Sequence, residues 1–262
     1  MKAAIVCIAK DEDKYIDEWL GYHLKLGFSK AFVYQNDWRY AGDRGAYGDA
    51  VEWIEFDGPC AQLKAYNDFL ANRRADFDFA AFFDVDEFMC LRPGLALGDF
   101  LGRFSRCAGV ALNWRLFGDA GLAAPEGDWS CVGRFVRRQA GFNKHVKTVV
   151  NLRTCGAVTG FVTPHSVNLG HAFDCVADAS GTRWVRGPFN FYEGPELPAW
   201  LNHYFCKTKA EYEAKKAKGR ADVDLRKYPE HVRKDSDFDA HNFNDVEDLT
   251  ARDFLLGKER TA

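Results

Sequence analysis

The stretch FAAFFDVDEFMCL, residues 79–91, is the part of the chain that decides the fold. It begins with five apolar residues, as expected of a strand buried in a sheet. Asp84, Asp86 and Glu87 then follow within four positions. Carboxylates this close repel one another unless a positive charge lies between them. The segment therefore predicts a buried strand that ends at a charged site.

The residues before this segment predict alternating strands and helices. The apolar run 3–9 is typical of a strand covered on both faces, and a helical stripe follows from Tyr15 to a capping glycine at Gly27. Further strands are expected at 30–37 and 50–56, and a further helix at 62–74. Strands separated by helices or loops predict a mostly parallel sheet, whose ligands bind beyond the carboxyl ends of the strands.

The second half of the chain has a different pattern. Strands are expected at 109–118, 146–153 and 157–165, with a Gly/Pro-rich loop at 119–129. Residues 207–221 predict a basic helix, which we expect to expose a solvated face. The alternative for this helix is contact with an anionic acceptor at a membrane surface.

Composition limits the class of protein. A chain of 262 residues with 47% hydrophobic and 28% charged residues is typical of one α/β domain with an appended C-terminal part. The net charge of -3 gives no reason to expect nucleic acid. The eight cysteines are never closer than 17 residues, which favours buried thiols over zinc or disulfide sites. Without a signal peptide or a long apolar run, we expect a cytoplasmic protein, free or peripheral at the inner face of the membrane.

The acidic cluster has three interpretations. The carboxylates can cap a helix, form a solvated turn, or bind a divalent metal ion. Mg²⁺ or Mn²⁺ takes oxygen ligands, usually one or two carboxylates together with substrate phosphates. The apolar residues on both sides favour the metal, because a merely solvated turn does not require them.

Several blocks of the sequence resemble a known family. They are IVCIAKDEDKYIDEWLGYHLKLGFSKAFVY, QLKAYNDFL, FFDVDEF, WRLFGDAG, KTVV and NHYFCKTKAEYEAKKAKG, and together they span about four fifths of the chain. In this order they resemble glycosyltransferases of the A-type fold, in the family-2-like and family-92-like group. The resemblance implies a Rossmann-like α/β fold with a mostly parallel sheet flanked by helices. It implies a catalytic domain at 1–206, with a nucleotide-sugar half (1–92) and an acceptor half (93–206), and a C-terminal helix and tail at 207–262.

The resemblance also implies the residues that bind the nucleotide sugar. Val85 lies within the acidic motif, and the motif's first carboxylate is shared between the metal and the ribose. Asn36 and Asp37 lie at the end of the second predicted strand, where relatives usually have the pattern Asp-Asn-x-Ser. The residues expected to contact the nucleotide sugar are Ala9, Lys10, Glu12, Asn36, Asp37, Gln62, Lys64, Asn67, Asp84, Val85, Lys147 and Lys207.

By the same resemblance, Mn²⁺ or Mg²⁺ is bound by Asp84 and Asp86, with Asp86 the firmer ligand. His203, followed by Lys207 in HYFCK, is the first choice for a third ligand, and His165 is its rival. The ion would stabilise the departing diphosphate. His145 and His171 are expected to be surface or core residues.

The acceptor hydroxyl requires a base if the reaction inverts the anomeric centre. Asp119 is the candidate, with Asp128 and Glu126 behind it. Aromatic side chains expected to stack on sugars are Trp114, Phe117, Trp129 and Trp184.

These features predict a metal-dependent, inverting glycosyltransferase. It would move a sugar from a nucleoside diphosphate sugar to a glycan or glycolipid, without a nucleic-acid partner. One alternative is a nucleotidyltransferase, although CIAKDEDKY contains no Gly-rich phosphate loop. The other is a non-catalytic carbohydrate-binding protein.

Overall fold

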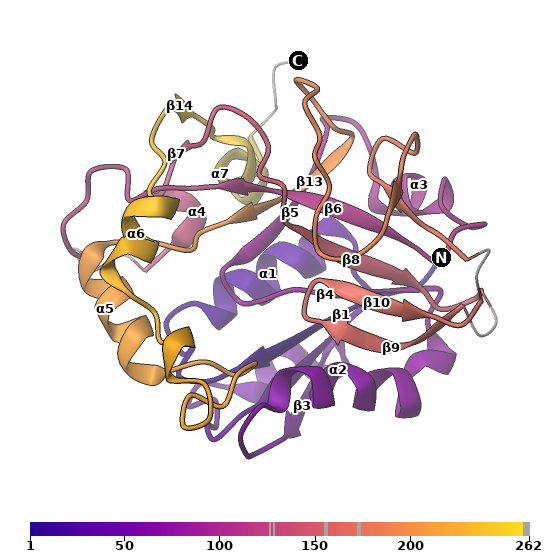
Figure 1. Cartoon of the computed structure of the whole chain (residues 1–262), viewed down its shortest axis with the longest axis horizontal. Coiled ribbons are helices and arrows are strands. Elements are labelled where there is room, and N and C mark those ends of the chain that lie inside the picture. Colours follow the sequence, from indigo (N-terminus) through magenta and orange to yellow (C-terminus); the bar gives the residue numbers. More distant parts are fainter. Residues whose placement is uncertain (126, 128, 155–156, 172–173, 259–262) are drawn as a thin grey trace.

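The computed structural model of the chain describes residues 1–258 except 126, 128, 155–156 and 172–173. It is an α/β structure built on a large central sheet with helices on both faces (Figure 1). The strands are β1 Ala3–Ala9, β2 Lys30–Gln35, β3 Val51–Glu55, β4 Phe79–Phe82, β5 Glu87–Leu91, β6 Gly109–Leu116, β7 Arg137–Arg138, β8 Val146–Asn151, β9 Val158–Thr163, β10 Ser166–Leu169, β11 Val176–Asp178, β12 Trp184–Val185, β13 Ala199–His203 and β14 Val246–Glu247. The α-helices are α1 Ile16–Leu26, α2 Ala61–Asn72, α3 Leu97–Gly102, α4 Cys131–Arg134, α5 Lys209–Lys218, α6 Asp235–His241 and α7 Thr250–Leu255.

The central sheet has the strand order β12-β11-β6-β8-β4-β1-β2-β3. The four strands β4, β1, β2 and β3 are mutually parallel, and β8 runs antiparallel between β4 and β6. Strand β13 pairs with β6 in parallel orientation and with β5 in antiparallel orientation. The predicted α/β fold with a mostly parallel sheet flanked by helices is therefore confirmed.

Strand β1 shows why the sheet is covered on both faces. Its seven residues are all buried. Ile5 and Cys7 belong to the cluster of apolar residues that includes α1 and α3, whereas Val6 and Ile8 belong to the cluster that includes α2. Because successive side chains of a strand point to opposite faces, an uninterrupted apolar run supplies both layers of the core.

The helices begin and end where the sequence provides the signals. Helix α1 has Asp17 and Glu18 in its first turn and ends at Gly27, whose φ of 117° is in the left-handed region. Helix α5 begins at a capping box in which the side chains of Thr208 and Glu211 each accept a hydrogen bond from the other's backbone N–H.

The opening stretch of sequence forms two strands instead of one. Strand β4 ends at Phe82, and a turn brings Asp84 and Asp86 to the start of β5, with the N–H of Glu87 donating to the carbonyl of Asp84 at 3.0 Å. Strand β5 then pairs with β13, away from the parallel strands. The carboxylates thus lie in the connection between two buried strands, where both flanks are held by sheet pairing.

The basic helix α5 differs from its expected solvated form. Helices α5 and α6 lie side by side at the left of Figure 1, where Tyr212 packs on Phe238. Lys209 and Lys216 pair with Asp235 of α6, while Lys215 and Lys218 turn inward to carboxylates of the main body. The structure also contains, within its described residues, no helix of the length and apolarity needed to cross a bilayer.

Candidate functional site

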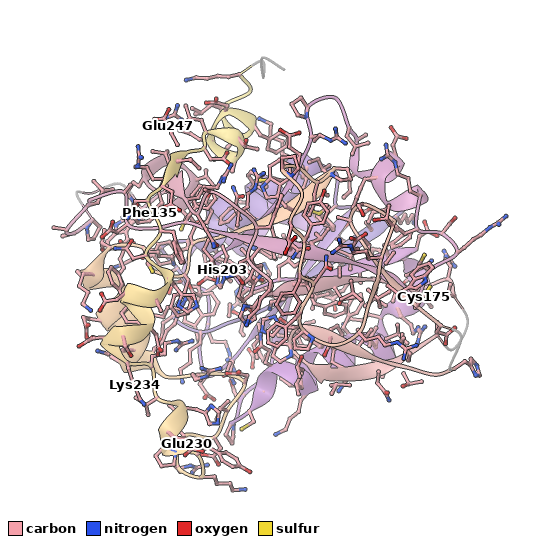
Figure 2. The ribbon with its side chains drawn as sticks, turned by 45° about the horizontal axis from the view of Figure 1, so that its top comes forward. Phe135, Cys175, His203, Glu230, Lys234 and Glu247 are labelled. Atoms are coloured by element: carbon pink, nitrogen blue, oxygen red, sulfur yellow. The ribbon has the colours of Figure 1, made fainter. Side chains whose placement is uncertain are left out.

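A cleft of about 390 Å³ lies at the carboxyl ends of β1 and β4. Its main-body wall includes Lys10, Glu12, Gln62, Asp84, Val85 and Asp86. The opposite wall comes from α5, α6 and the loop between them, and includes Lys215, Lys218, Arg220, Asp222, Arg233 and Asp237. Figure 2 shows His203 near the middle of the molecule, inward from the C-terminal segment that carries Lys234. The carboxyl-end location is where open α/β sheets bind ligands.

Asp84 is held by side chains from two elements, α2 and β8, and the hydroxyl of Tyr66 on α2 also lies 3.5 Å from its Oδ1. Its Oδ1 accepts a hydrogen bond of 2.7 Å from Nε2 of Gln62 on α2, and its Oδ2 lies 3.0 Å from Nζ of Lys147 on β8. The side chain of Asp84 is 36% exposed, so one side of the carboxylate still faces the cleft.

Asp86 is more deeply buried and lies between a lysine and a histidine, whose own pKa is lowered by burial. Its Oδ2 lies 2.6 Å from Nζ of Lys215, and its Oδ1 lies 3.6 Å from Nε2 of His203. Burial alone would raise the pKa of Asp86, but the charges of Lys215 and His203 outweigh burial and hold the pKa well below its usual range. Asp86 is therefore an anion at neutral pH, bound to a cation from the C-terminal segment.

Glu87 and Lys147 form a fully buried pair beneath the cleft. Their side chains have no exposure, and Nζ of Lys147 lies 3.5 Å from Oε2 of Glu87. Burial raises the pKa of Glu87 well above its usual value, more than Lys147 can lower it. Burial also disfavours charge on Lys147, yet Asp84 and Glu87 raise its pKa well above the usual value. The positive charge that the acidic stretch requires is therefore an ammonium group of the protein itself.

Three histidines and a tryptophan form the aromatic side of the cleft. The ring of Trp114 lies 4.2 Å from that of His203, 5.0 Å from His145 and 5.2 Å from His165, measured between ring centroids. Burial lowers the pKa of His165 to about 3 and that of His145 to about 4. Both rings are neutral at pH 7. His145, expected to be a surface or core residue, thus lies at the cleft. Phe117, expected to stack on a sugar, lies in the core.

The side chains expected to bind a metal ion already have partners within the protein. Asp84 and Asp86 each already have an ammonium partner, and Nδ1 of buried His203 has no hydrogen-bond partner among the described residues. Within that part of the chain, no three His, Cys, Asp or Glu side chains converge as a metal-binding set. As arranged, these residues do not fit a divalent ion, and the Mn²⁺ or Mg²⁺ inferred from the resemblance stays a prediction.

The residues expected to bind the nucleotide sugar fall into two groups. Lys10, Glu12, Gln62, Asp84 and Val85 line the cleft together. Ala9 lies in the sheet just behind them, with its carbonyl accepting from the N–H of Asn36.

The others have different surroundings. Asn36 donates to the carbonyls of Phe56 and Gly58, Lys64 donates to the carbonyl of Pro59, and Asn67 accepts from the N–H of Phe161. Asp37 pairs with Lys10 at 3.6 Å. Lys207 is buried, with its Nζ 3.3 Å from the centre of the Tyr15 ring. Lys147 lies beneath the acidic turn, as described above.

Asp119, the candidate base, ties the C-terminal segment to the body. Its two carboxylate oxygens accept hydrogen bonds from the side chains of Asn242 and Asn244. Among the residues that the structure describes, Asp119 is not part of the cleft lining. Its alternatives, Glu126 and Asp128, lie outside the described residues.

The sequence did not place Lys215, Lys218 and Arg220 of the predicted basic helix at the nucleotide-sugar site. The alternative role of this helix was contact with an anionic acceptor, and Arg233 was not predicted at all. For Lys215 and Lys218, the sequence contained a signal in the spacing of charged residues. Glu211, Lys215 and Lys218 follow one another at helical spacing, so they share one face of α5, and buried Glu211 is bound by Arg134 at 2.7 Å. A face that begins with a buried ion pair is directed at the protein and not at solvent.

Comparisons with known proteins give matches among solved structures and none in the other two searches. No protein-family model matches the chain, and a search of curated proteins found no relative. Among solved structures, the crystal structure of S. aureus TarS 1-349 matches with 16% identity and a TM-score of 0.34, covering 58% of this chain and 47% of that one. The crystal structure of S. aureus TarS matches with 15% identity and a TM-score of 0.35, covering 65% of this chain and 28% of that one. The chain thus spans less than half the length of these structures, and at such scores function has to be argued from the site itself.

Proposed function

We propose that the protein transfers a glycosyl group from a nucleoside diphosphate sugar to a hydroxyl of a glycan or glycolipid. The observation that carries the proposal is the cleft in which Asp84 and Asp86 face Lys215, Lys218, Arg220 and Arg233. It lies where parallel α/β sheets bind nucleotides, and it provides cations for phosphates beside carboxylates suited to sugar hydroxyls. The family resemblance of the acidic motif points to the same reaction.

The chemistry proposed for this cleft is a direct displacement. The bond between the anomeric carbon and the diphosphate oxygen breaks, and its electron pair leaves with the nucleoside diphosphate. The acceptor oxygen forms the new bond to the anomeric carbon, which inverts its configuration. The hydroxyl proton passes to a carboxylate that lines the cleft, a place that Asp119, bound by Asn242 and Asn244 outside this lining, does not occupy here.

A thermal-shift screen of nucleotide sugars tests the proposal. A ligand at about 100 times its dissociation constant stabilises the native state by about 2.7 kcal/mol, which raises the melting temperature of a chain of this size by about 5 °C or more. We expect one nucleoside diphosphate sugar to produce this shift, and its nucleoside monophosphate to produce a smaller one. The screen is run in EDTA and again in Mn²⁺, so that the predicted metal dependence is read from the same plate.

Other outcomes identify the alternative functions. A shift with nucleoside triphosphates but none with nucleotide sugars would point to a nucleotidyltransferase. A shift with oligosaccharides alone would point to a carbohydrate-binding protein. Hydrolysis or transfer of the stabilising nucleotide sugar, followed by release of nucleoside diphosphate, then separates an enzyme from a binding protein.

A further inference from the structure

Arg233 is a cation of the cleft wall with an unusual set of partners. Its Nη1 donates to the backbone carbonyls of Lys215, at 3.3 Å, and Gly219. Among the described residues, no carboxylate forms an ion pair with it. A guanidinium group has five N–H donors, so most of those on Arg233 are left for a ligand in the cleft.

The neighbouring cations are each held by an acidic side chain. Nε and Nη2 of Arg220 make a two-pronged pair with Asp222, at 2.9 and 2.7 Å. Lys218 pairs with Glu12 and Lys215 with Asp86. Arg220 also helps burial to lower the pKa of Arg233, as expected for two guanidinium groups near each other. Like charges gathered at one wall of a cleft favour an anionic ligand.

The balance of charge over the whole cleft favours an anion as well. Five lysines and arginines and five acidic side chains line it. Behind this lining lie the buried side chains of Lys147, Lys207 and Glu87, two bases and one acid. The surroundings therefore carry an excess of positive charge before any ion binds, which a diphosphate can neutralise.

We propose that Arg233 and Arg220, supported by Lys215 and Lys218, bind the diphosphate of the donor and take the place of a divalent ion. The identity of the ligand as a nucleoside diphosphate rests on the proposed function. Guanidinium groups match phosphate oxygens in paired hydrogen bonds. A metal ion bound to Asp84 and Asp86 would first have to displace the lysines that pair with these two aspartates. The C-terminal segment, and Arg233 in particular, thereby supplies the phosphate subsite.

Titration calorimetry with inorganic pyrophosphate in EDTA tests this subsite. Wild-type protein is expected to bind pyrophosphate without added metal. Arg233→Ala is expected to weaken binding by about 10- to 100-fold, since hydrogen bonds between charged groups are lost. Arg233→Lys keeps the charge but loses the planar guanidinium that donates paired hydrogen bonds, so it should restore binding only in part. The matched control is Arg226→Ala, because Arg226 is 79% exposed and pairs with Asp224 outside the cleft.

Two results would overturn the subsite: binding of pyrophosphate only after Mn²⁺ is added, or equal binding by Arg233→Ala, Arg226→Ala and wild type. Circular dichroism and melting temperatures of the three variants show whether each is folded. Failure of the proposed function gives a different pattern, in which pyrophosphate binds as described but no nucleotide sugar binds. Nucleotide sugars that bind wild type and Arg233→Ala equally would leave the function standing and remove Arg233 from it.

Discussion

Replacing Asp86 with Asn is expected to lower the rate of sugar transfer by about 100-fold or more, the usual cost of removing a charged group from the reacting region of an active site. Asp86 fixes Lys215 at 2.6 Å and faces His203 at 3.6 Å, so its charge positions a cation beside the proposed diphosphate subsite. The asparagine keeps the size of the side chain and removes only the charge. Release of nucleoside diphosphate from the donor identified by the screen measures the loss.

A double-mutant cycle with Lys215→Met shows whether the two residues act as a pair. If Asp86 works by anchoring Lys215, either single change should cause most of the loss, and the double variant should be little worse. Additive losses would mean separate roles. A different result would assign Asp86 to a metal ion instead. Wild-type activity would then disappear in EDTA and return with Mn²⁺, whereas the activity of Asp86→Asn would not respond to Mn²⁺.

Asp86 should also affect stability in a pH-dependent way. Its pKa in the folded state is depressed, because Lys215 and His203 outweigh the effect of burial. The unfolded value is about 4, so its contribution to stability is fully present above that pH and is lost as the pH falls through the lower folded value. In a His203→Gln background, where the neighbouring imidazole no longer titrates, the change in unfolding free energy caused by Asp86→Asn should therefore be constant from pH 5 to 7 and smaller at pH 3.5. Urea denaturation at these three pH values measures it, and a difference that grows on acidification would contradict the ion pair.

Local patterns were enough to predict the parallel strands of the sheet, but not β5, β11, β12 or β13. The uninterrupted apolar run of β1 and the glycine that ends α1 are signals carried by neighbouring residues. They determine strand, helix and coverage without information from distant parts of the chain. The division of residues 79–91 into two strands was not predictable in this way, because β5 is fixed by pairing with β13, more than a hundred residues later.

The main-body wall of the cleft was predictable from local patterns, whereas the wall from the C-terminal segment depends on packing between distant parts of the chain. Lys10, Gln62 and Asp84 lie at strand ends or at the start of α2, so the topology of a parallel sheet brings them together. Arg233 reaches the cleft only because α6 packs on α5, and the partner that Asp86 takes from α5 is 129 residues away. Composition could not distinguish Lys215, which faces the cleft, from Lys216, which pairs with Asp235 on the outside. Helical spacing from buried Glu211 was the available clue.

Lys147→Met is the change expected to cost most in stability, about 3 kcal/mol, because it removes one partner of a buried ion pair. Lys147 has no exposure and contacts Asp84 at 3.0 Å and Glu87 at 3.5 Å. Without it, the acidic turn keeps its repulsion and loses the positive charge that offsets it. Urea denaturation at pH 7 gives the difference, with Lys30→Met as a matched control: Lys30 also pairs with a glutamate from a strand, but it is 30% exposed and should cost less than about 1 kcal/mol.

The double variant Lys147→Met/Glu87→Gln shows which carboxylate needs the lysine. Asp84 is 36% exposed and can be solvated, whereas Glu87 has no exposure, and one of its oxygens, Oε1, has no hydrogen-bond partner among the described residues. A neutral amide at position 87 removes the buried acid and should recover about half of the lost stability. If the double variant is no more stable than Lys147→Met, then Asp84 is the group that requires the ammonium. If Lys147→Met itself costs no more than Lys30→Met, the lysine is not needed to hold the acidic turn together, and the cleft owes its charge balance to the C-terminal cations alone.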